Sequence, residues 1–257
     1  MRANPVKAKL AQGGTSLGTM VFEFNTSGIG RIIAAAGAEF VIYDTEHTGW
    51  GIDTVRMLMA TSRSADLVPL VRVPATQYHL LANPLDAGAM GLMVPMVESE
   101  EQAQLIARSV KYPPEGRRGA AFGVAHDDYG LEPGTPVEKM ARANREVLII
   151  AQIETAAGVE NVEKIAAVPG IDILWIGHND LTNSMNIAGQ FTHPDYLAAV
   201  ERVLAAGKAH NKPIGIMSGS VADARAALAQ GFRIVAYNGD LWIYGQALKE
   251  GLKAIQA

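Results

Sequence analysis

The amino-acid sequence predicts an α/β protein, a single (β/α)8 TIM barrel. Eight short runs of apolar and β-branched residues alternate with longer helical patterns from one end of the chain to the other. The chain has 257 residues, an ordinary length for such a barrel. The alternative, a doubly wound open sheet, usually carries a glycine-rich phosphate loop after its first strand. Here the first strand runs into Phe22-Glu23-Phe24-Asn25, which is no such loop.

The expected elements follow one another in a regular order. The strand runs are SLGTMVF (16–22), EFVIY (39–43), LVPLVRV (67–73), MGLMV (90–94), VLIIAQI (147–153), DILWI (172–176), PIGIM (213–217) and FRIVAY (232–237). Helical patterns cover 28–36, 53–62, 99–110, 156–167, 195–210, 221–229 and 241–255. Gly37, Gly88, Gly170 and Gly231 stand where a helix ends and the next strand begins. Because no linker or long repeat interrupts this rhythm, one domain over residues 1–257 is expected.

Composition narrows the classes of function. Hydrophobic residues make up 49% of the chain and charged residues 19%, which excludes intrinsic disorder. The net charge of -4 and the absence of a basic run exclude a nucleic-acid partner. With no cysteine, any metal must use oxygen or nitrogen ligands. No apolar run approaches a membrane span and residues 1–14 resemble no signal peptide, so no membrane partner and a cytoplasmic location are expected.

Polar residues follow four of the predicted strands. In a barrel the chemistry collects at the carboxyl ends of the strands, so these residues are expected on one rim. They are Asp44-Thr45-Glu46-His47, Val71-Arg72-Val73-Pro74, Gln152-Ile153-Glu154-Thr155 and Gly177-His178-Asn179-Asp180. A single acid after a strand often caps the next helix. Several like charges on one rim are costly without a cation, which favours a functional site.

The residue types on this rim suggest a chemistry. Two carboxylates without a thiol suit a hard divalent cation, Mg²⁺ or Mn²⁺ by preference, with Co²⁺ as the remaining candidate. Arg72 could stabilise negative charge on a substrate oxygen, or form a structural ion pair with a strand-end carboxylate. His47 stands three residues after Asp44, whose carboxylate could orient the imidazole for proton transfer.

The remaining histidines and the lysines are less suited to catalysis. His79, His193 and His210 are expected to be structural, whereas His126 and His178 lie in candidate rim loops and stay open. An imine-forming aldolase needs a lysine near the carboxyl end of a barrel strand. No lysine occupies such a position, because Lys212 precedes the seventh strand and the others fall in helices or loops. An imine mechanism is therefore disfavoured.

Seven stretches in order resemble the HpcH/HpaI family, the metal-dependent class II aldolases acting on 4-hydroxy-2-oxo acids. They are YDTEH (43–47), PLVRVP (69–74), LDAGA (85–89), VPMV (94–97), YPPEGRRG (112–119), QIET (152–155) and IGHNDL (176–181). The resemblance implies the barrel fold, usually assembled as a trimer of dimers. It also implies reversible aldol cleavage that yields pyruvate, or a close analogue such as hydroxypyruvate, and an aldehyde.

The resemblance also implies roles for individual residues. Glu154 and Asp180 match the metal ligands, Arg72 matches the residue that contacts the 2-oxo oxygen, and His47 with Asp44 matches the acid-base dyad.

Further positions are assigned by the same resemblance. Glu46 falls beside the dyad, where it would support the residues around it or bind a metal-bound water, and Asp86 matches a position that reaches the site of a neighbouring subunit. Gln152, Gly177, His178 and Asn179 are assigned to substrate binding, with backbone N–H groups of 177–180 holding the substrate carboxylate.

Two departures from the family pattern concern the wall of the pocket. The family often has proline where this chain has His178, and residues 120–129 replace a familiar Ala-Arg-Ala stretch. Both departures change the part of the pocket that would bind the aldehyde half of the substrate more than they change the metal site.

Two alternatives to the aldolase stay open. A CoA-ester lyase of the citrate-lyase β-subunit type would need room for CoA, which no basic cluster beside the rim indicates. A non-catalytic barrel that binds a ligand is disfavoured by the intact carboxylate pair together with Arg72 and His47.

Overall fold

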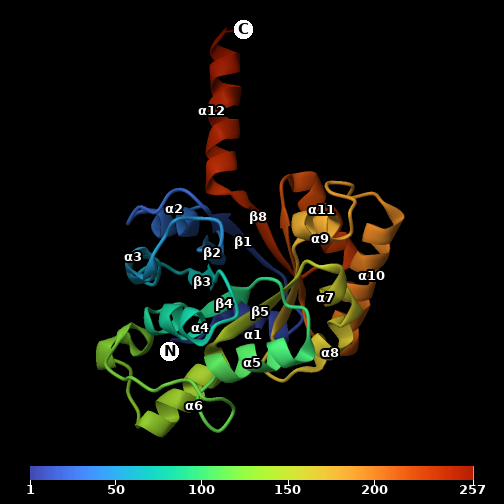
Figure 1. Ribbon diagram of the computed structural model, residues 1–257. Helices are drawn as coiled ribbons and strands as arrows, with labels where there is room; N and C mark the ends of the chain where they lie inside the picture. The colour runs from blue at the N-terminus through green and yellow to red at the C-terminus, as the bar shows by residue number, and fades with distance from the viewer. Residues whose placement is uncertain (257) are drawn as a thin grey trace.

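Eight parallel strands close into a barrel in the computed structural model, which describes residues 1–256 (Figure 1). The strands are β1 (Ser16–Val21), β2 (Phe40–Asp44), β3 (Val68–Arg72), β4 (Gly91–Val94), β5 (Leu148–Ile153), β6 (Ile173–Ile176), β7 (Ile214–Ser218) and β8 (Ile234–Gly239). Each strand pairs with the next, and β8 pairs with β1. The predicted barrel is confirmed. Residue 257, the end of the single domain expected over 1–257, lies outside the described residues.

Helices connect the strands and surround the barrel. They are α1 (Pro5–Ala11), α2 (Ile29–Ala35), α3 (Ile52–Ser62), α4 (Tyr78–Asp86), α5 (Glu100–Val110), α6 (Pro136–Glu146), α7 (Ala156–Glu160), α8 (Val162–Ala167), α9 (His178–Ser184), α10 (Pro194–Ala209), α11 (Val221–Gln230) and α12 (Asp240–Gln256), with a 3-10 helix, η1 (Ala125–Gly130). The seven predicted helices are present, although 156–167 forms two helices that meet at Asn161. Gly37, Gly88, Gly170 and Gly231 all have positive φ, as expected at these helix ends.

Two apolar layers hold the barrel together. Inside it, Phe40, Met93 and Trp175 pack against residues of α1, with Val6 and Leu10 almost fully buried in the same cluster. Outside it, strand residues that point the other way pack against the surrounding helices. The strands therefore bury both faces, which explains their almost continuous apolar sequences.

Helix α12 departs from the usual arrangement. It continues from β8 and projects away from the barrel, as Figure 1 shows. Only its first residue, Asp240, is buried, and the carboxylate of Asp240 accepts hydrogen bonds from the backbone N–H groups of Phe22, Glu23 and Phe24. The remaining length of α12 exposes a series of large apolar side chains. Of the helices in residues 1–256, none has the length and apolar character to cross a membrane.

Candidate active site

A cleft of about 160 Å³ opens at the carboxyl ends of the strands. Seven residues predicted from the sequence line it: His47, Arg72, Gln152, Gly177, His178, Asn179 and Asp180. The other lining residues are Met20, Phe22, Met93, Trp175, Ile176, Met217 and Trp242. The structure therefore gathers residues from β3, β5 and β6 and from the loops after β2 and β6 at one place, as the order of the strands requires.

Arg72 is held beside this cleft by two carboxylates. Its Nε donates to Asp44 Oδ1 over 2.6 Å, and its Nη1 lies 3.2 Å from Glu46 Oε2. The guanidinium carbon lies 5.7 Å from the centre of the Phe22 ring. Because Arg72 forms these ion pairs and also lines the cleft, the structural and catalytic interpretations of this residue are compatible.

His47 lies at the mouth of the cleft, with its side chain 58% exposed. The sequence predicts that Asp44 orients the imidazole of His47, but in the structure the Asp44 carboxylate binds other donors. Asp44 Oδ2 accepts from the backbone N–H of His47 over 3.0 Å, while Oδ1 accepts from Arg72 and from the backbone N–H of Glu46. These three donors occupy Asp44, and the imidazole instead lies beside Glu46, whose Oε2 is 3.7 Å from His47 Nε2. Burial raises the pKa of Glu46, although Arg72 and His47 oppose this effect.

Glu154 is a buried carboxylate below the cleft, with only 1% of the residue exposed. Its Oε1 accepts from the backbone N–H of Met96 over 2.7 Å, and its Oε2 accepts from Gln152 Nε2. Burial raises the pKa of Glu154 to about 7, and the charges of Glu46 and Asp180 act in the same direction. Met96 has φ of 53°, in the left-handed region that non-glycine residues seldom adopt, and this conformation accompanies its hydrogen bond to Glu154.

Asp180 lies in the first turn of α9 and is exposed. The loop before it passes close to Glu154, because a Cβ added to Gly177 would collide with Glu154 Oε2 and Gln152 Nε2. A glycine is therefore required for β6 to run on past the buried carboxylate. Asn179 is exposed beside Asp180, and Gln152 Oε1 is buried without a hydrogen-bond partner.

The two acids are not helix caps. The hydroxyl of Thr155 accepts from the backbone N–H of Gly158 over 3.0 Å and so caps α7 in place of Glu154. At the start of α9 no side chain makes a capping hydrogen bond, so Asp180 does not serve this purpose either. The simplest structural explanation of both residues is therefore excluded.

Other candidates from the sequence lie away from the cleft. Asp86 ends α4 and pairs with Arg118, whose guanidinium covers the Tyr112 ring. His126 is buried in η1, where its Nε2 contacts the carbonyl of Ala121. Lys212 Nζ donates to the carbonyl of Ile171, two residues before β6 begins, on the opposite rim, as the sequence predicts.

Sequence reasoning missed the aromatic wall of the cleft. Trp242 belongs to the first turn of α12, and its ring meets that of Phe22 edge-on with centroids 5.0 Å apart. Trp175 lies on β6, and a Cβ on Gly215 of the neighbouring strand would collide with its ring. The sequence carries no signal for Trp242, because its place depends on where α12 leaves β8.

Comparison with known proteins identifies the family. The model of the HpcH/HpaI aldolase/citrate lyase family matches residues 22–245. The chain belongs to this family. A relative named 5-keto-4-deoxy-D-glucarate aldolase, from Salmonella arizonae, is 36% identical over 215 residues, which are 83% of this chain and 82% of the relative. The predictions of a carbon-carbon lyase and of an aldolase are confirmed, and the non-catalytic alternative is wrong.

Solved structures agree with this assignment. A HpcH/HpaI aldolase/citrate lyase family protein from Burkholderia cenocepacia is 31% identical, with a TM-score of 0.93 over 99% of this chain and 100% of that one. A citrate lyase β subunit from M. tuberculosis, complexed with oxaloacetate and magnesium, is 19% identical, with a TM-score of 0.57 over 90% of this chain and 93% of that one. This second protein shares the fold alone.

Proposed function

We propose that the protein is a metal-dependent aldolase that reversibly cleaves a 4-hydroxy-2-oxo acid into an aldehyde and pyruvate, or a close analogue such as hydroxypyruvate. The observation that supports this most directly is the buried carboxylate of Glu154 beside a cleft lined by Arg72, His47 and Asp180. Burial raises the pKa of Glu154, and the charge of Asp180 acts in the same direction. The carboxylate of Glu154, the guanidinium of Arg72 and the imidazole of His47 lie at one cleft, and such a set of groups suits the formation of an enolate.

The residues present fit a divalent cation. Glu154 and Asp180 supply oxygen ligands, and a cation would offset the cost of keeping Glu154 ionised in a buried place. The unpartnered Gln152 Oε1 is a further polar oxygen at the same place. Within residues 1–256 no three His, Asp or Glu side chains are grouped to hold a metal, so other positions fall to water and substrate. Mg²⁺ and Mn²⁺ accept such a partial protein shell, and Co²⁺ is the third candidate.

The chain's own residues then divide the chemistry between them. The cation, when bound, supplies a Lewis acid for the 1-carboxylate and 2-oxo groups. Arg72, fixed by Asp44 and Glu46, donates to the 2-oxo oxygen as negative charge develops there. His47 accepts the proton of the C4 hydroxyl while the C3–C4 bond breaks, and Glu46 stabilises the resulting imidazolium. The aldehyde leaves, and the proton taken from the C4 hydroxyl balances the one that C3 of the enolate gains as pyruvate is released.

A panel of aldehydes tests this proposal. The chelator-treated protein is mixed with pyruvate or hydroxypyruvate and each aldehyde, with and without Mn²⁺, and products are identified by mass. We expect aldol products that depend on the added ion. Failure to form a product with any aldehyde at saturating Mn²⁺ would refute the aldolase.

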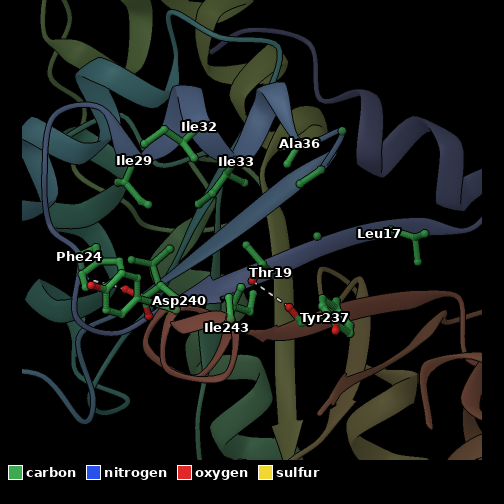
Figure 2. Close-up of a pocket in the computed structure, with 16 residues that line it drawn as sticks. Leu17, Thr19, Phe24, Ile29, Ile32, Ile33, Ala36, Tyr237, Asp240 and Ile243 are labelled. Atoms are coloured by element: carbon green, nitrogen blue, oxygen red, sulfur yellow. Dashed lines mark hydrogen bonds between the residues drawn. The ribbon is translucent and has the colours of Figure 1, made fainter. Parts of the chain in front are cut away.

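We also propose that the protein is a homo-oligomer in which α12 of one copy covers a groove on another. The groove has a volume of about 600 Å³ and is lined by β1, α2 and the base of α12. Figure 2 shows Ile29, Ile32 and Ile33 of α2 on one side of it, across from Thr19 and Ile243. A barrel normally places its last helix over such a surface, but here α12 projects away from it.

The exposed side of α12 is suited to such a groove. Leu241, Tyr244, Leu248, Leu252 and Ile255 recur at helical spacing and are exposed. Because each copy carries both the groove and the helix, two copies can exchange helices symmetrically, which closes a dimer. The family resemblance extends this to a trimer of dimers.

Light scattering decides the oligomeric proposal. We expect the double variant Leu248→Glu and Leu252→Glu to have a lower mass than the wild type, because charges replace apolar contacts. A wild-type mass equal to one chain would contradict the proposal.

A further inference from the structure

A second cleft adjoins the catalytic one. It has a volume of about 420 Å³ and lies between β7, α10 and α11. The lining residues that matter for its chemistry are His178, Phe191, Tyr196, Ile216, Met217 and Asp223. His178 and Met217 line both clefts, so these two side chains form the boundary between them.

The imidazole of His178 packs against aromatic rings at this boundary. Its ring meets that of Phe191 edge-on, with centroids 5.3 Å apart, and Phe191 in turn meets Tyr196 at 5.9 Å. Its Nδ1 is buried and has no hydrogen-bond partner. A buried ring nitrogen without a partner is unusual in a folded protein, and a ligand can supply the missing bond when the ring turns to bring this nitrogen to the cleft.

The lining of the second cleft restricts the ligand. It contains no lysine or arginine, and Asp223 is its only carboxylate. An anionic group would therefore meet Asp223 without a compensating cation. A hydroxyl suits the site better, because it pairs with the free nitrogen of either imidazole tautomer by donating or by accepting. The apolar residues around it, such as Phe191 and Ile216, accommodate the carbon chain.

We infer that His178 selects the aldehyde half of the substrate by hydrogen bonding to an uncharged hydroxyl next to the aldehyde carbon. This inference rests on the proposed aldolase activity. With the 1-carboxylate and 2-oxo groups held near Asp180 and Arg72, the part of the substrate beyond C4 extends past His178 into the second cleft. The favoured aldehydes are short α-hydroxyaldehydes without a carboxylate.

A matched pair of aldehydes measures the role of His178. Glycolaldehyde and acetaldehyde differ only in the hydroxyl, and each is added to pyruvate by the Mn²⁺-loaded protein. We expect the ratio of kcat/KM for glycolaldehyde over acetaldehyde to fall about tenfold in His178→Phe, which keeps an aromatic ring and loses the nitrogen. His178→Gln, which keeps polar atoms, is expected to restore part of the ratio.

Other results would overturn the assignment. An equal loss with both aldehydes, or an unchanged ratio, would reduce His178 to a packing residue. In the wild type, which needs no variant to fold, a preference for glyoxylate or for acetaldehyde over glycolaldehyde would refute the uncharged hydroxyl. If the wild type neither forms an aldol product nor decarboxylates oxaloacetate with Mn²⁺, the proposed function itself has failed.

Discussion

Replacing Glu154 by glutamine should make the metal-free protein more stable while removing its activity. A buried carboxyl whose pKa is about 7 instead of 4.5 costs about 3 kcal/mol of folding free energy once it is ionised in both states. Below pH 4.5 the group is neutral in both the folded and the unfolded protein, so the cost vanishes there. The cost develops as the pH rises from 4.5 and is complete above about 7.

Glutamine fits the same hydrogen bonds. Its amide oxygen can still accept from the backbone N–H of Met96. Its NH₂ group can donate to Gln152 Oε1, which has no partner in the structure, once the Gln152 amide turns over. The substitution therefore removes a buried charge without adding an unpaired polar group, because the turned Gln152 nitrogen takes the place of an oxygen that already has no partner.

Urea unfolding in EDTA at one protein concentration checks this prediction. At pH 8 we expect Glu154→Gln to gain up to about 3 kcal/mol in the free energy of unfolding, with no gain near pH 4. In parallel, isothermal titration should find that Mn²⁺ binding is lost. The matched variant Asp180→Asn should lose Mn²⁺ binding without the stability gain, because Asp180 is exposed. A destabilised Glu154→Gln variant that binds Mn²⁺ like the wild type would refute the reasoning.

Three further predictions concern the same cleft. His47→Ala should lower the rate of aldol cleavage by about 100-fold but the rate of oxaloacetate decarboxylation much less, because decarboxylation removes no proton from a C4 hydroxyl. Equal losses in both rates would assign His47 to substrate or metal binding instead. Borohydride with pyruvate should leave the protein active while EDTA inactivates it, and pyruvate trapped on any lysine by mass spectrometry would contradict the metal mechanism. Gly177→Ala should lose Mn²⁺ affinity, because the added Cβ displaces the Glu154 carboxylate. The control Gly49→Ala should keep it, because no atom lies within 4 Å of the Cβ added there, and equal affinities of the two variants by calorimetry would contradict this account.

The strands and the rim could be predicted because the barrel makes local sequence informative. Residues of β5 are buried on both faces, so the sequence VLIIAQI is apolar almost throughout. Because all strands run in parallel, residues that follow β2, β3, β5 and β6 necessarily meet on one rim. The positions of Arg72, Glu154 and Asp180 at this rim follow from topology alone.

Other features depend on contacts that sequence spacing does not encode. Helix α4 contains Pro84 and α9 begins directly after Gly177, so neither gives a clear helical pattern. A separation of three residues suggested that Asp44 binds the His47 ring, but the backbone turn and Arg72 occupy that carboxylate. The apolar spacing of α12 is the same whether the helix packs on its own barrel or on another copy.

Cleavage of a 4-hydroxy-2-oxo acid tests the central claim most directly. The chelator-treated protein is given 4-hydroxy-2-oxopentanoate, and pyruvate and acetaldehyde are measured before and after Mn²⁺ is added, for the wild type and for Glu154→Gln. We expect equal amounts of both products from the wild type only after Mn²⁺ is added, and almost none from the variant. Release of pyruvate at the same rate without the ion, or from Glu154→Gln, would contradict a metal-dependent aldolase built on Glu154.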